Sequence, residues 1–395
     1  MREGWKYQKL GELVKVINGL WVGKKPPFTN VAVVRNANFT KSCTLDMSNI
    51  AYIDVEEKQF NTRELQYADI IIEKSGGSEK QPVGRPVFFN IKDRGYSFSN
   101  FTATLRVVSS DIVPEYLYKV LLAQYKQGVT KRLQSKTTGL HNLDFKSYLK
   151  SVIPIPSCEK QLSIVSELDK INELIRLKKE QLKDYDNLAQ SIFYEMFGDP
   201  VVNEKGWDFK KIGEIGTVER GAGISKKDFV EDGLPCIHYG QLHTILGPTT
   251  RHHHSCIPES LLPKYKIAHT NDVIMAITSE DVEGSCKSTA WLGNYDIVIG
   301  SDAAILHHEQ DGTFLSYYTM TKAFFNEKSK YAKGFKVTHI SAKEIENIPV
   351  YLPPLALQKD FAKRIEVIEH QKENIKSTIQ DLETLLASRM QYWFD

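Results

Sequence analysis

The densest group of potential metal ligands in the sequence is "RHHHSC" at residues 251–256. Imidazole and thiolate groups bind zinc, but adjacent side chains point in different directions and no second ligand pair follows at zinc-finger spacing. "GLWVGKK" at residues 19–25 carries glycines and lysines as phosphate-binding loops do, yet its glycine spacing is one residue short and no Ser or Thr follows the lysine. We therefore expect a polar loop at the histidines, and neither a metal site nor a nucleotide site.

Two further stretches carry catalytic residue types. "KPPF" at residues 25–28 differs by one residue from the Asn/Asp-Pro-Pro-aromatic motif of DNA amino-methyltransferases. The Asn or Asp of that motif accepts a hydrogen bond from the target amino group, whereas Lys25 can only donate one. "DFK" at residues 144–146 and 208–210 resembles the Asp-x-Lys end of nuclease sites, but no partner carboxylate is evident upstream. We expect the chain to be no enzyme and to need no cofactor.

Polar and basic side chains in several loop-like stretches are better suited to binding nucleic acid. Phosphate oxygens accept hydrogen bonds from Lys, Arg, Ser and Thr, and base edges match Arg, Asn, Gln and Lys. A solvated surface is the alternative for any single lysine, so the clusters carry more weight than their members. The candidates in the first half are Arg35, Asn36, Asn38, Lys74, Ser75, Lys80, Lys131, Arg132, Gln134, Ser135 and Lys136. Those in the second half are His238, Tyr239, Gln241, Lys287, Lys328, Lys330, Lys333 and Lys336.

These loops belong to a chain whose N-terminal stretch is repeated in its second half. "GWKYQKLGELVKVINGLWVGKK" at residues 4–25 matches "GWDFKKIGEIGTVERGAGISKK" at residues 206–227 without a gap. A second block, "IPIPSCEKQLSIV" at residues 153–165, matches "VYLPPLALQKDFA" at residues 350–362, and this register holds to the end of the chain. Looser matches in the same order lie between the two blocks. The pattern predicts a tandem repeat of a variable domain followed by a helical segment.

The helical segments can be recognised by the spacing of their apolar residues. Residues 159–197 contain no proline and no glycine, and apolar residues recur at alternating steps of three and four, which predicts a coiled-coil seam. A lysine stands at one core position of each seam, Lys178 in the first and Lys372 in the second. A helix of this length reaches roughly 58 Å. The predicted seams are Leu168, Ile171, Ile175, Leu182, Tyr185, Ala189, Ile192 and Met196, and then Phe361, Ile365, Ile368, Ile375, Ile379, Leu382, Leu386 and Trp393.

We expect the two helices to pair antiparallel within the chain. The connector from Asp199 to Gly206 is too short to return along such a helix, and antiparallel pairing needs no return. Runs such as "DIIIE" (69–73) and "DVIMAI" (272–277) are strand-like, and "TFLSYYTMTKAFFNEKSKYAKG" (313–334) predicts an amphipathic helix. The predicted fold class is α+β: two mixed α/β heads, separated by two long helices that form an antiparallel coiled coil, in a pseudo-twofold internal repeat. The predicted regions are a first head at 1–156, a helical region at 157–200, a second head at 201–353 and a C-terminal helical region at 354–395.

The bulk composition is that of an ordinary soluble protein. The 395 residues are 41% hydrophobic and 25% charged, and the formal net charge of +2 neither demands nor excludes an anionic partner. The five cysteines are scattered and form no CxxC pair, so we expect reduced thiols and a cytoplasmic location. The N-terminal stretch lacks the apolar region of a signal peptide and no run of roughly 18 apolar residues occurs, so no membrane contact is expected.

The elements "GWxxxxLGE", a D-[IV]-[IL] strand, "IPxP…Q" and a helix ending like "LxxSxFxxMFGD" closely resemble the specificity subunits of type I restriction-modification systems, over essentially the whole chain. The second copy departs from the pattern, since it ends in "YWFD". The resemblance implies two target recognition domains that each read one half of a split double-stranded DNA sequence. It also implies helices that space them and dock two methyltransferase subunits, with restriction/translocase subunits in the full complex. A rod of this length can supply a spacing of about 34 Å, one duplex turn.

The two heads differ strongly between their framework positions, which implies an asymmetric target. The alternative interpretation is a coiled-coil scaffold whose two heads bind proteins. Charge reversal at Arg35, Lys131 and Arg132 separates the two interpretations, because a scaffold would keep its partners.

Overall fold

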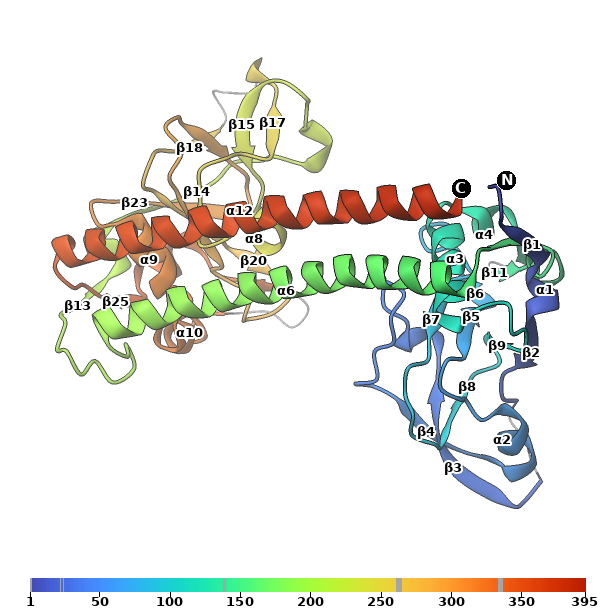
Figure 1. The fold of residues 1–395 in the computed structure, drawn as a ribbon. Coiled ribbons are helices and arrows are strands. Elements are labelled where there is room, and N and C mark those ends of the chain that lie inside the picture. The colour runs from blue at the N-terminus through green and yellow to red at the C-terminus, as the bar shows by residue number, and fades with distance from the viewer. Residues whose placement is uncertain (1, 22, 24, 138–139, 261–264, 333–336) are drawn as a thin grey trace. The chain divides into compact units, whose positions relative to one another are not determined.

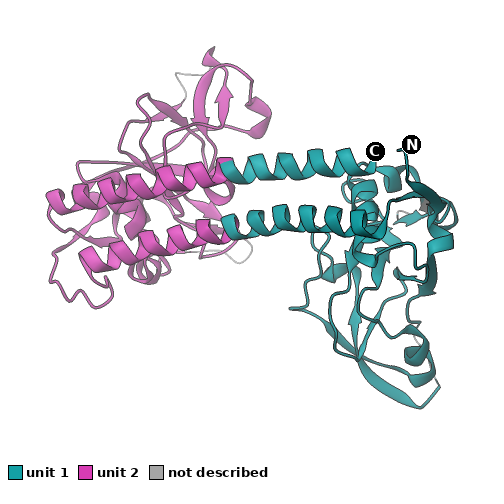
Figure 2. Cartoon of the chain, viewed as in Figure 1, with its two compact units in different colours: residues 1–178, 378–395 teal, residues 179–377 magenta. Residues whose placement is uncertain are grey.

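The computed structural model describes residues 2–21, 23, 25–137, 140–260, 265–332 and 337–395 (Figure 1). The chain divides into two compact units, which are coloured separately in Figure 2. Unit 1 comprises residues 1–178 and 378–395, and unit 2 comprises residues 179–377. Each unit therefore contains one head and a part of both long helices.

Head 1 is built from short strands that are joined by shorter helices. Its strands are β1 (Lys6–Lys9), β2 (Val14–Asn18), β3 (Phe28–Val34), β4 (Ala51–Glu56), β5 (Ile70–Glu73), β6 (Ser75–Gly77), β7 (Pro86–Phe88), β8 (Tyr96–Phe98), β9 (Thr102–Val107), β10 (Gln134–Thr137), β11 (Leu140–Leu143) and β12 (Val152–Ile155). Its helices are α1 (Leu10–Leu13), η1 (Asn36–Asn38), α2 (Glu57–Arg63), α3 (Pro114–Lys126), α4 (Val129–Arg132) and α5 (Phe145–Tyr148).

The centre of head 1 is the antiparallel sheet β2-β9-β5-β7. All four side chains of β5 are buried, as expected for a short apolar run covered on both faces. Helix α3 packs against β7, and a second sheet, β4-β3-β8, meets the first through a core that includes Val34, Ile71 and Phe98. The remaining strands form the small sheet β10-β11-β6 and the pair β1-β12. The pair β1-β12 joins the first strand of the head to its last.

Head 2 repeats this plan. Its strands are β13 (Phe209–Lys211), β14 (Gly216–Arg220), β15 (Leu234–Ile237), β16 (Thr249–Thr250), β17 (Ser255–Ile257), β18 (Lys266–Ala268), β19 (Val273–Ala276), β20 (Thr278–Ser279), β21 (Ser288–Trp291), β22 (Ile297–Ile299), β23 (Ala303–His308), β24 (Thr338–His339) and β25 (Pro349–Tyr351). Its helices are α7 (Ile212–Ile215), η2 (Lys226–Asp228), α8 (Tyr239–Thr244), α9 (Gly312–Tyr318), α10 (Lys322–Lys328) and α11 (Ala342–Glu346).

The sheets of head 2 follow the order of head 1. The central sheet β14-β23-β19-β21-β16 corresponds to β2-β9-β5-β7 with one strand added. Asp69 and Asp272 stand directly before the central strands β5 and β19, and each accepts a hydrogen bond from the backbone N–H three residues upstream, at 2.8 and 2.7 Å. Each also contacts a basic residue on the neighbouring strand, Arg106 at 2.7 Å and His307 at 2.8 Å. The internal repeat is therefore a repeat of hydrogen-bonded framework as well as of sequence.

The prediction of a single helix over residues 313–334 is wrong in its extent. The segment forms two short helices, α9 and α10, separated by a turn. All seven residues of α9 are buried, and the Thr321 hydroxyl accepts a hydrogen bond from the Phe324 N–H (3.3 Å) to begin α10. A threonine cap of this kind begins a new helix. The spacing of the apolar residues does not reveal this break, because it is compatible with one continuous helix. Residues 333 and 334 lie outside the described residues.

The two long helices are α6 (Cys158–Phe197) and α12 (Leu355–Phe394), which lie side by side in each unit (Figure 1). In unit 1 the first part of α6 meets the end of α12, where Glu167 accepts a hydrogen bond from Trp393 Nε1 (3.1 Å) and pairs with Arg389. In unit 2 the end of α6 meets the start of α12, and the rings of Phe193 and Phe361 lie 5.6 Å apart. The helices therefore run antiparallel in both units, which confirms the predicted arrangement.

The seams of these helices are buried largely where the spacing predicted. The lysine at the core of the second seam, Lys372, is 6% exposed, whereas Lys178 is half-buried. Burial by itself lowers the pKa of Lys372, but hydrogen bonds from its ammonium to Asp186 and Glu369, both at 2.7 Å, outweigh burial and raise it. Within the described ranges no helix combines the length and the apolar character that a membrane span requires. The buried seam positions are Leu168, Ile171, Ile175, Ala189, Met196, Phe361, Ile365, Ile368, Ile375, Ile379, Leu386 and Trp393.

Candidate nucleic-acid interface

Several of the predicted contact residues of head 1 come together at the small sheet β10-β11-β6. Asn36, at the start of η1, donates from Nδ2 to the backbone oxygen of Ser75 on β6 (2.7 Å). The Ser75 hydroxyl donates to Oδ1 of Asn142 on β11 (2.5 Å). Ser135 lies opposite Asn142 on β10 and is exposed, and its neighbour Gln134 is half-buried. The fold thus unites segments that are far apart in the chain.

Residues that the sequence analysis missed complete this surface. Lys74 donates from Nζ to Oδ1 of Asn18 (2.9 Å), and partial burial lowers the pKa of Lys74. The backbone oxygen of Phe101 accepts hydrogen bonds from the N–H groups of Lys74 (2.8 Å) and Ser75 (3.1 Å). Phe101 itself is 45% exposed. Amides beside an exposed apolar ring are groups that can contact base edges. We call the set Asn18, Asn36, Lys74, Ser75, Phe101 and Asn142 the head 1 surface.

The other predicted residues of head 1 differ in their surroundings. Arg35 is exposed directly before Asn36, and Lys80 is exposed in the turn after β6. Lys131 and Arg132 are exposed in α4, immediately before β10. These side chains can reach phosphate groups. Lys136 belongs to β10, but its side chain lies outside the described parts of the structure.

Asn38 and Gln241 occupy equivalent places in the two heads, and both support a loop from within. Asn38 is 2% exposed, and its Oδ1 accepts from the Arg35 N–H (2.9 Å) while Nδ2 donates to a backbone oxygen. Gln241 Oε1 accepts from the N–H of His238 in the same way (2.9 Å). These hydrogen bonds fix the start of η1 and of α8. We therefore assign both residues to positioning the loops.

Arg85 holds the same loop of head 1 from below. Its Nη1 donates to the backbone oxygen of Phe39 (2.8 Å), and its Nε donates to Oε2 of Glu73 (3.1 Å). The side chains of Arg85 and Glu73 are only 5% and 1% exposed. Burial raises the pKa of Glu73, and the Arg85 guanidinium opposes that rise. The pair fixes the backbone that presents Asn36.

In head 2 the predicted residues lie at the N-terminus of α8. His238 is 8% exposed, and its Nδ1 accepts from the Gly240 N–H (3.1 Å). Burial lowers the pKa of His238, and the Lys226 charge lowers it further, so the ring is neutral at pH 7. Tyr239 is half-buried beside it. His238 therefore acts as a cap, and Tyr239 is the member of this pair that reaches the surface.

A polar set equivalent to the head 1 surface is present in head 2, and the sequence analysis missed most of it. The Thr278 hydroxyl on β20 donates to Oδ1 of Asp302 (3.4 Å) and lies 3.3 Å from Nδ1 of His339 on β24. Arg220, at the end of β14, donates from Nε to a backbone oxygen (2.9 Å), and its Nη2 is 3.9 Å from Asp302 Oδ1. We call the set Arg220, Tyr239, Thr278, Asp302 and His339 the head 2 surface.

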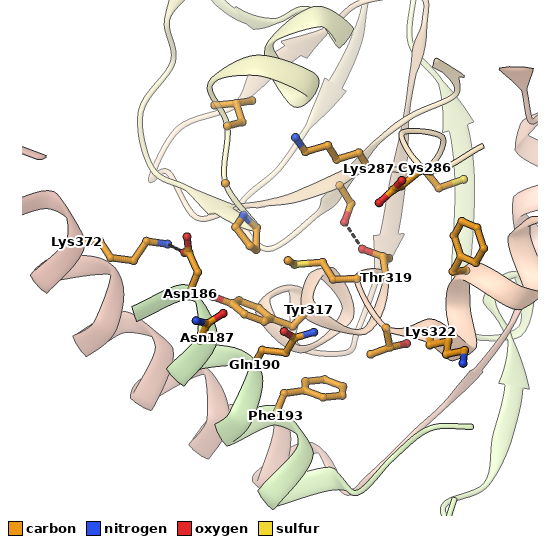
Figure 3. A pocket seen from close by; sticks show the side chains of 18 of the residues that line it. Asp186, Asn187, Gln190, Phe193, Cys286, Lys287, Tyr317, Thr319, Lys322 and Lys372 are labelled. Carbon is orange, nitrogen blue, oxygen red and sulfur yellow. Dashed lines mark hydrogen bonds and ion pairs between the residues drawn. The ribbon is translucent and has the colours of Figure 1, made fainter. Parts of the chain in front are cut away.

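A hollow of about 860 Å³ lies in unit 2 between the long helices and head 2 (Figure 3). Asn187 and Gln190 face it from α6, and Tyr317 faces it from α9 (Figure 3). The predicted contact residue Lys287 lines the hollow and is exposed, and its Nζ donates to the backbone oxygen of His243 (3.2 Å). Because both long helices share this lining, we treat the hollow as separate from the head 2 surface.

The lysines near the end of α10 do not form one patch. Lys328 is 4% exposed and donates to backbone oxygens of the turn at 283–285, and burial lowers its pKa. Lys328 therefore stabilises that turn. Lys330 is exposed, and its side chain pairs with a glutamate three residues earlier (2.6 Å). Lys333 and Lys336 lie outside the described residues.

The histidine cluster takes part in ordinary polar contacts. His253 Nδ1 lies 2.7 Å from the Tyr295 hydroxyl, and Arg251 pairs with Glu366 on α12 at 2.6 Å. Among the residues that the structure describes, no three His, Cys, Asp or Glu side chains are placed to hold a metal ion together.

The comparison with known families matches this architecture. The profile of the family described as "Type I restriction modification DNA specificity domain" matches residues 2–184 and again residues 204–384. The chain belongs to this family and contains two copies of its domain, which confirms the resemblance found in the sequence.

Individual relatives are similar over nearly the full chain. The specificity subunit of the type I restriction enzyme MjaVIII of Methanocaldococcus jannaschii is 22% identical over 429 residues, covering 98% of this chain and 92% of the relative. A putative MjaX specificity subunit of the same organism is 21% identical over 406 residues, covering 98% and 93%. In fold, the chain resembles the S subunit of a type I restriction-modification system from M. genitalium (TM-score 0.54, 12% identity, 99% and 96% covered). It also resembles a chain solved in work on complex assembly and conformational transition of the type I R-M system (TM-score 0.59, 18% identity, 100% and 98% covered).

Proposed function

We propose that this chain is the DNA sequence-specificity subunit of a type I restriction-modification complex. In this role each head reads one half of an asymmetric, bipartite target in double-stranded DNA. The observation that carries the proposal is that the two heads share one fold but present different polar side chains on their equivalent surfaces. Two heads of one fold can present themselves to DNA alike, and different side chains on them then select different half-sites.

We infer that the long helices bind the partner subunits. We expect these helices to dock two methyltransferase subunits, with restriction/translocase subunits in the full complex. Away from the seam, α6 keeps Leu174 and Leu177 exposed at 47% and 46% in unit 1, and Leu188 at 46% in unit 2. Val367 on α12 is 63% exposed. Exposed apolar side chains at such positions favour protein contacts, and catalysis in this assignment belongs to the docked subunits.

The division of labour along the chain follows the same logic. Residues 1–156 and 201–353 serve as recognition domains, and residues 157–200 and 354–395 serve as the helical regions. A cytoplasmic setting fits the five cysteines, which are all unpaired. Burial raises the pKa of Cys43 to about 11, so this thiol stays protonated and inert.

The proposal is tested by selecting bound duplexes from a random library. The chain is co-expressed with its methyltransferase subunits, and the bound pool is sequenced at several salt concentrations. The expected result is a split motif, with binding that falls steeply as salt rises because phosphate counterions are released. A pool without any split motif would contradict the proposal.

The scaffold alternative makes a different prediction for charge reversal. Arg35→Glu, Lys131→Glu and Arg132→Glu should weaken DNA binding while assembly with the methyltransferase subunits persists. Lys92→Glu, a reversal at another exposed lysine of head 1, is the matched control. If the three reversals leave DNA binding equal to that of the control, head 1 does not bind DNA through this face.

Replacing one head tests the assignment of half-sites. A chimaera that carries residues 201–353 of another family member should change one half of the selected motif. The other half should stay as it was, because head 1 is untouched. A change in both halves would show that the heads do not read DNA separately.

A further inference from the structure

The two heads share a backbone frame that can be matched residue by residue. The Lys74 N–H donates to the Phe101 oxygen at 2.8 Å, and the Ile277 N–H donates to the Asp302 oxygen at 3.0 Å. The Leu143 N–H donates to the Lys74 oxygen at 2.8 Å, and the corresponding bond from Ile340 to Ile277 measures 3.0 Å. In head 1 these bonds bring together the end of β5, the turn before β9, and β11. In head 2 they bring together the end of β19, the turn before β23, and β24.

The matched frame defines pairs of positions. Ser75 lies opposite Asn142 in the β6–β11 register, and Thr278 lies opposite His339 in the β20–β24 register. The other pairs follow from the same frame, from the ungapped repeat and, for residues 36 and 239, from the equivalent hydrogen bonds of Asn38 and Gln241. They are Asn18 with Arg220, Asn36 with Tyr239 and Phe101 with Asp302.

At most of these pairs the chemistry differs although the surrounding framework is kept, and only Ser75 and Thr278 share a group, the hydroxyl. Head 1 offers amides and an exposed phenyl ring, and head 2 offers a guanidinium, a carboxylate, an imidazole and a phenol. Buried polar atoms without a hydrogen-bond partner also gather at the sheet of head 1, at Asn36 Oδ1, Gln134 Oε1 and His141 Nδ1. Unsatisfied polar groups are rare in folded proteins and often mark functional places.

The geometry points to the head 1 surface and the head 2 surface as the base-reading sites, with different base preferences. This inference rests on the proposed function and assigns residues to it. Asn amides match adenine, and an exposed apolar ring suits the thymine methyl group, so head 1 reads A·T pairs through Asn18, Asn142 and Phe101. Arginine matches guanine O6 and N7, so head 2 reads a G·C pair through Arg220.

The surroundings of Arg220 suit such a role. Its side chain is 57% exposed. Its Nε is held by the Ser301 oxygen at 2.9 Å, and Asp302 stands 3.9 Å from Nη2, so the outer N–H groups of the fork remain to donate. A lysine at this position would keep the charge but lose the fork. Phosphate affinity and base preference can therefore be separated by one substitution.

The experiment begins with the split motif selected by the unmodified complex. If no split motif emerges, the proposed function itself fails, and that failure is distinct from the ones below. Deoxyuridine is then placed for thymine in the first half-site, which removes the methyl group. In the second half-site 7-deazaguanine replaces guanine, which removes the N7 acceptor. Loss of the N7 acceptor should weaken binding by the unmodified complex roughly 5- to 150-fold. Loss of the thymine methyl group should weaken it about 4-fold, as expected for one buried methyl-sized group. Binding that is unchanged by these replacements, or a second half-site without guanine, overturns the inference.

Two variants then locate the contacts. Phe101→Ala should become indifferent to deoxyuridine. Arg220→Lys should lose its preference at one position of the second half-site, with little change in salt dependence. Arg251→Lys, the same change at an arginine of head 2 that pairs with Glu366, is the control and should leave the motif intact. If Phe101→Ala stays sensitive to deoxyuridine, or Arg220→Lys selects the original motif, the residue assignment is wrong.

Discussion

Replacing Glu73 by glutamine should destabilise head 1 strongly. The carboxylate pairs with Arg85 through Nε–Oε2 at 3.1 Å and Nη2–Oε1 at 3.3 Å, and the two side chains are 1% and 5% exposed. Glutamine would leave a buried guanidinium without a counter-charge, which costs about 3–5 kcal/mol. For a unit of this size each kcal/mol shifts Tm by about 2–4 °C, so the first unit should melt roughly 6–20 °C earlier.

Hydrogen exchange resolved along the chain is the appropriate assay, since unit 2 serves as a control within the same molecule. Amides of β5 and β9 should lose protection in Glu73→Gln, and those of β19 and β23 should not. Head 2 carries Ala276 and Lys287 at the equivalent positions, so the frame itself does not require the pair. Glu73→Leu combined with Arg85→Met should accordingly unfold closer to the parent than Glu73→Gln does. Equal protection in the parent and in Glu73→Gln would refute the reasoning.

Burial lowers the pKa of His308 from 6.5 to about 4. The folded state therefore disfavours protonation, and unit 2 should lose up to about 3 kcal/mol as pH falls from 6.5 towards 4, a dependence that His308→Gln should flatten in denaturant titrations. Leu177→Glu and Leu188→Glu should reduce association with methyltransferase subunits at least tenfold by sedimentation, without changing Tm, because both side chains are about half exposed; unchanged association would remove these leucines from the docking surface. Lys372→Met should lower the free energy of unfolding by about 1–3 kcal/mol, because Asp186 is 62% exposed and can turn to water whereas Glu369 is only 20% exposed and loses its ammonium partner; an unchanged free energy of unfolding would show that Glu369 does not depend on this lysine.

The long helices were the part of the fold that the sequence specified best. Their apolar spacing, the absence of proline and glycine, and the repeat predicted residues 159–197, and α6 begins one residue earlier at Cys158. The seam positions are close neighbours in sequence, so local spacing determines which of them face the partner helix. The segment at 313–334 was harder, because a buried threonine cap outweighs periodicity there.

The binding surfaces were only partly predictable, because their members come from distant segments. Composition selected Asn36 and Ser75, which lie on the proposed head 1 surface, but also Asn38 and Lys328, which are buried and bind the backbone. Nothing local distinguishes a lysine that donates to carbonyls from one that reaches a phosphate. Phe101 was missed because nothing in the neighbouring sequence distinguishes an exposed aromatic residue from a buried one. A better guide to the binding surfaces is a comparison of the two repeats, at positions where the backbone hydrogen bonds are the same and the side chains differ.

The repeat also shows how the surface of a head can change while the head stays attached to the long helices. Gln161 and Gln358, both fully buried, stand near the starts of α6 and α12. Each accepts a hydrogen bond from the backbone N–H of the residue before a head helix, Val113 at 2.7 Å and Asp311 at 3.0 Å. Each also donates to the backbone oxygen of a proline shortly before its own helix, Pro156 at 2.9 Å and Pro353 at 2.8 Å. Most partners in these anchors are main chain, although Gln358 Nε2 also donates to the side-chain oxygen of Gln310 at 2.9 Å. The anchors therefore depend little on side-chain changes elsewhere in the head. The residues that differ between the two surfaces take no part in them. If Asn18 and Arg220 read bases as we propose, a substitution at either of them should alter recognition while the attachment of the head persists. A subunit with exchangeable half-sites requires this property.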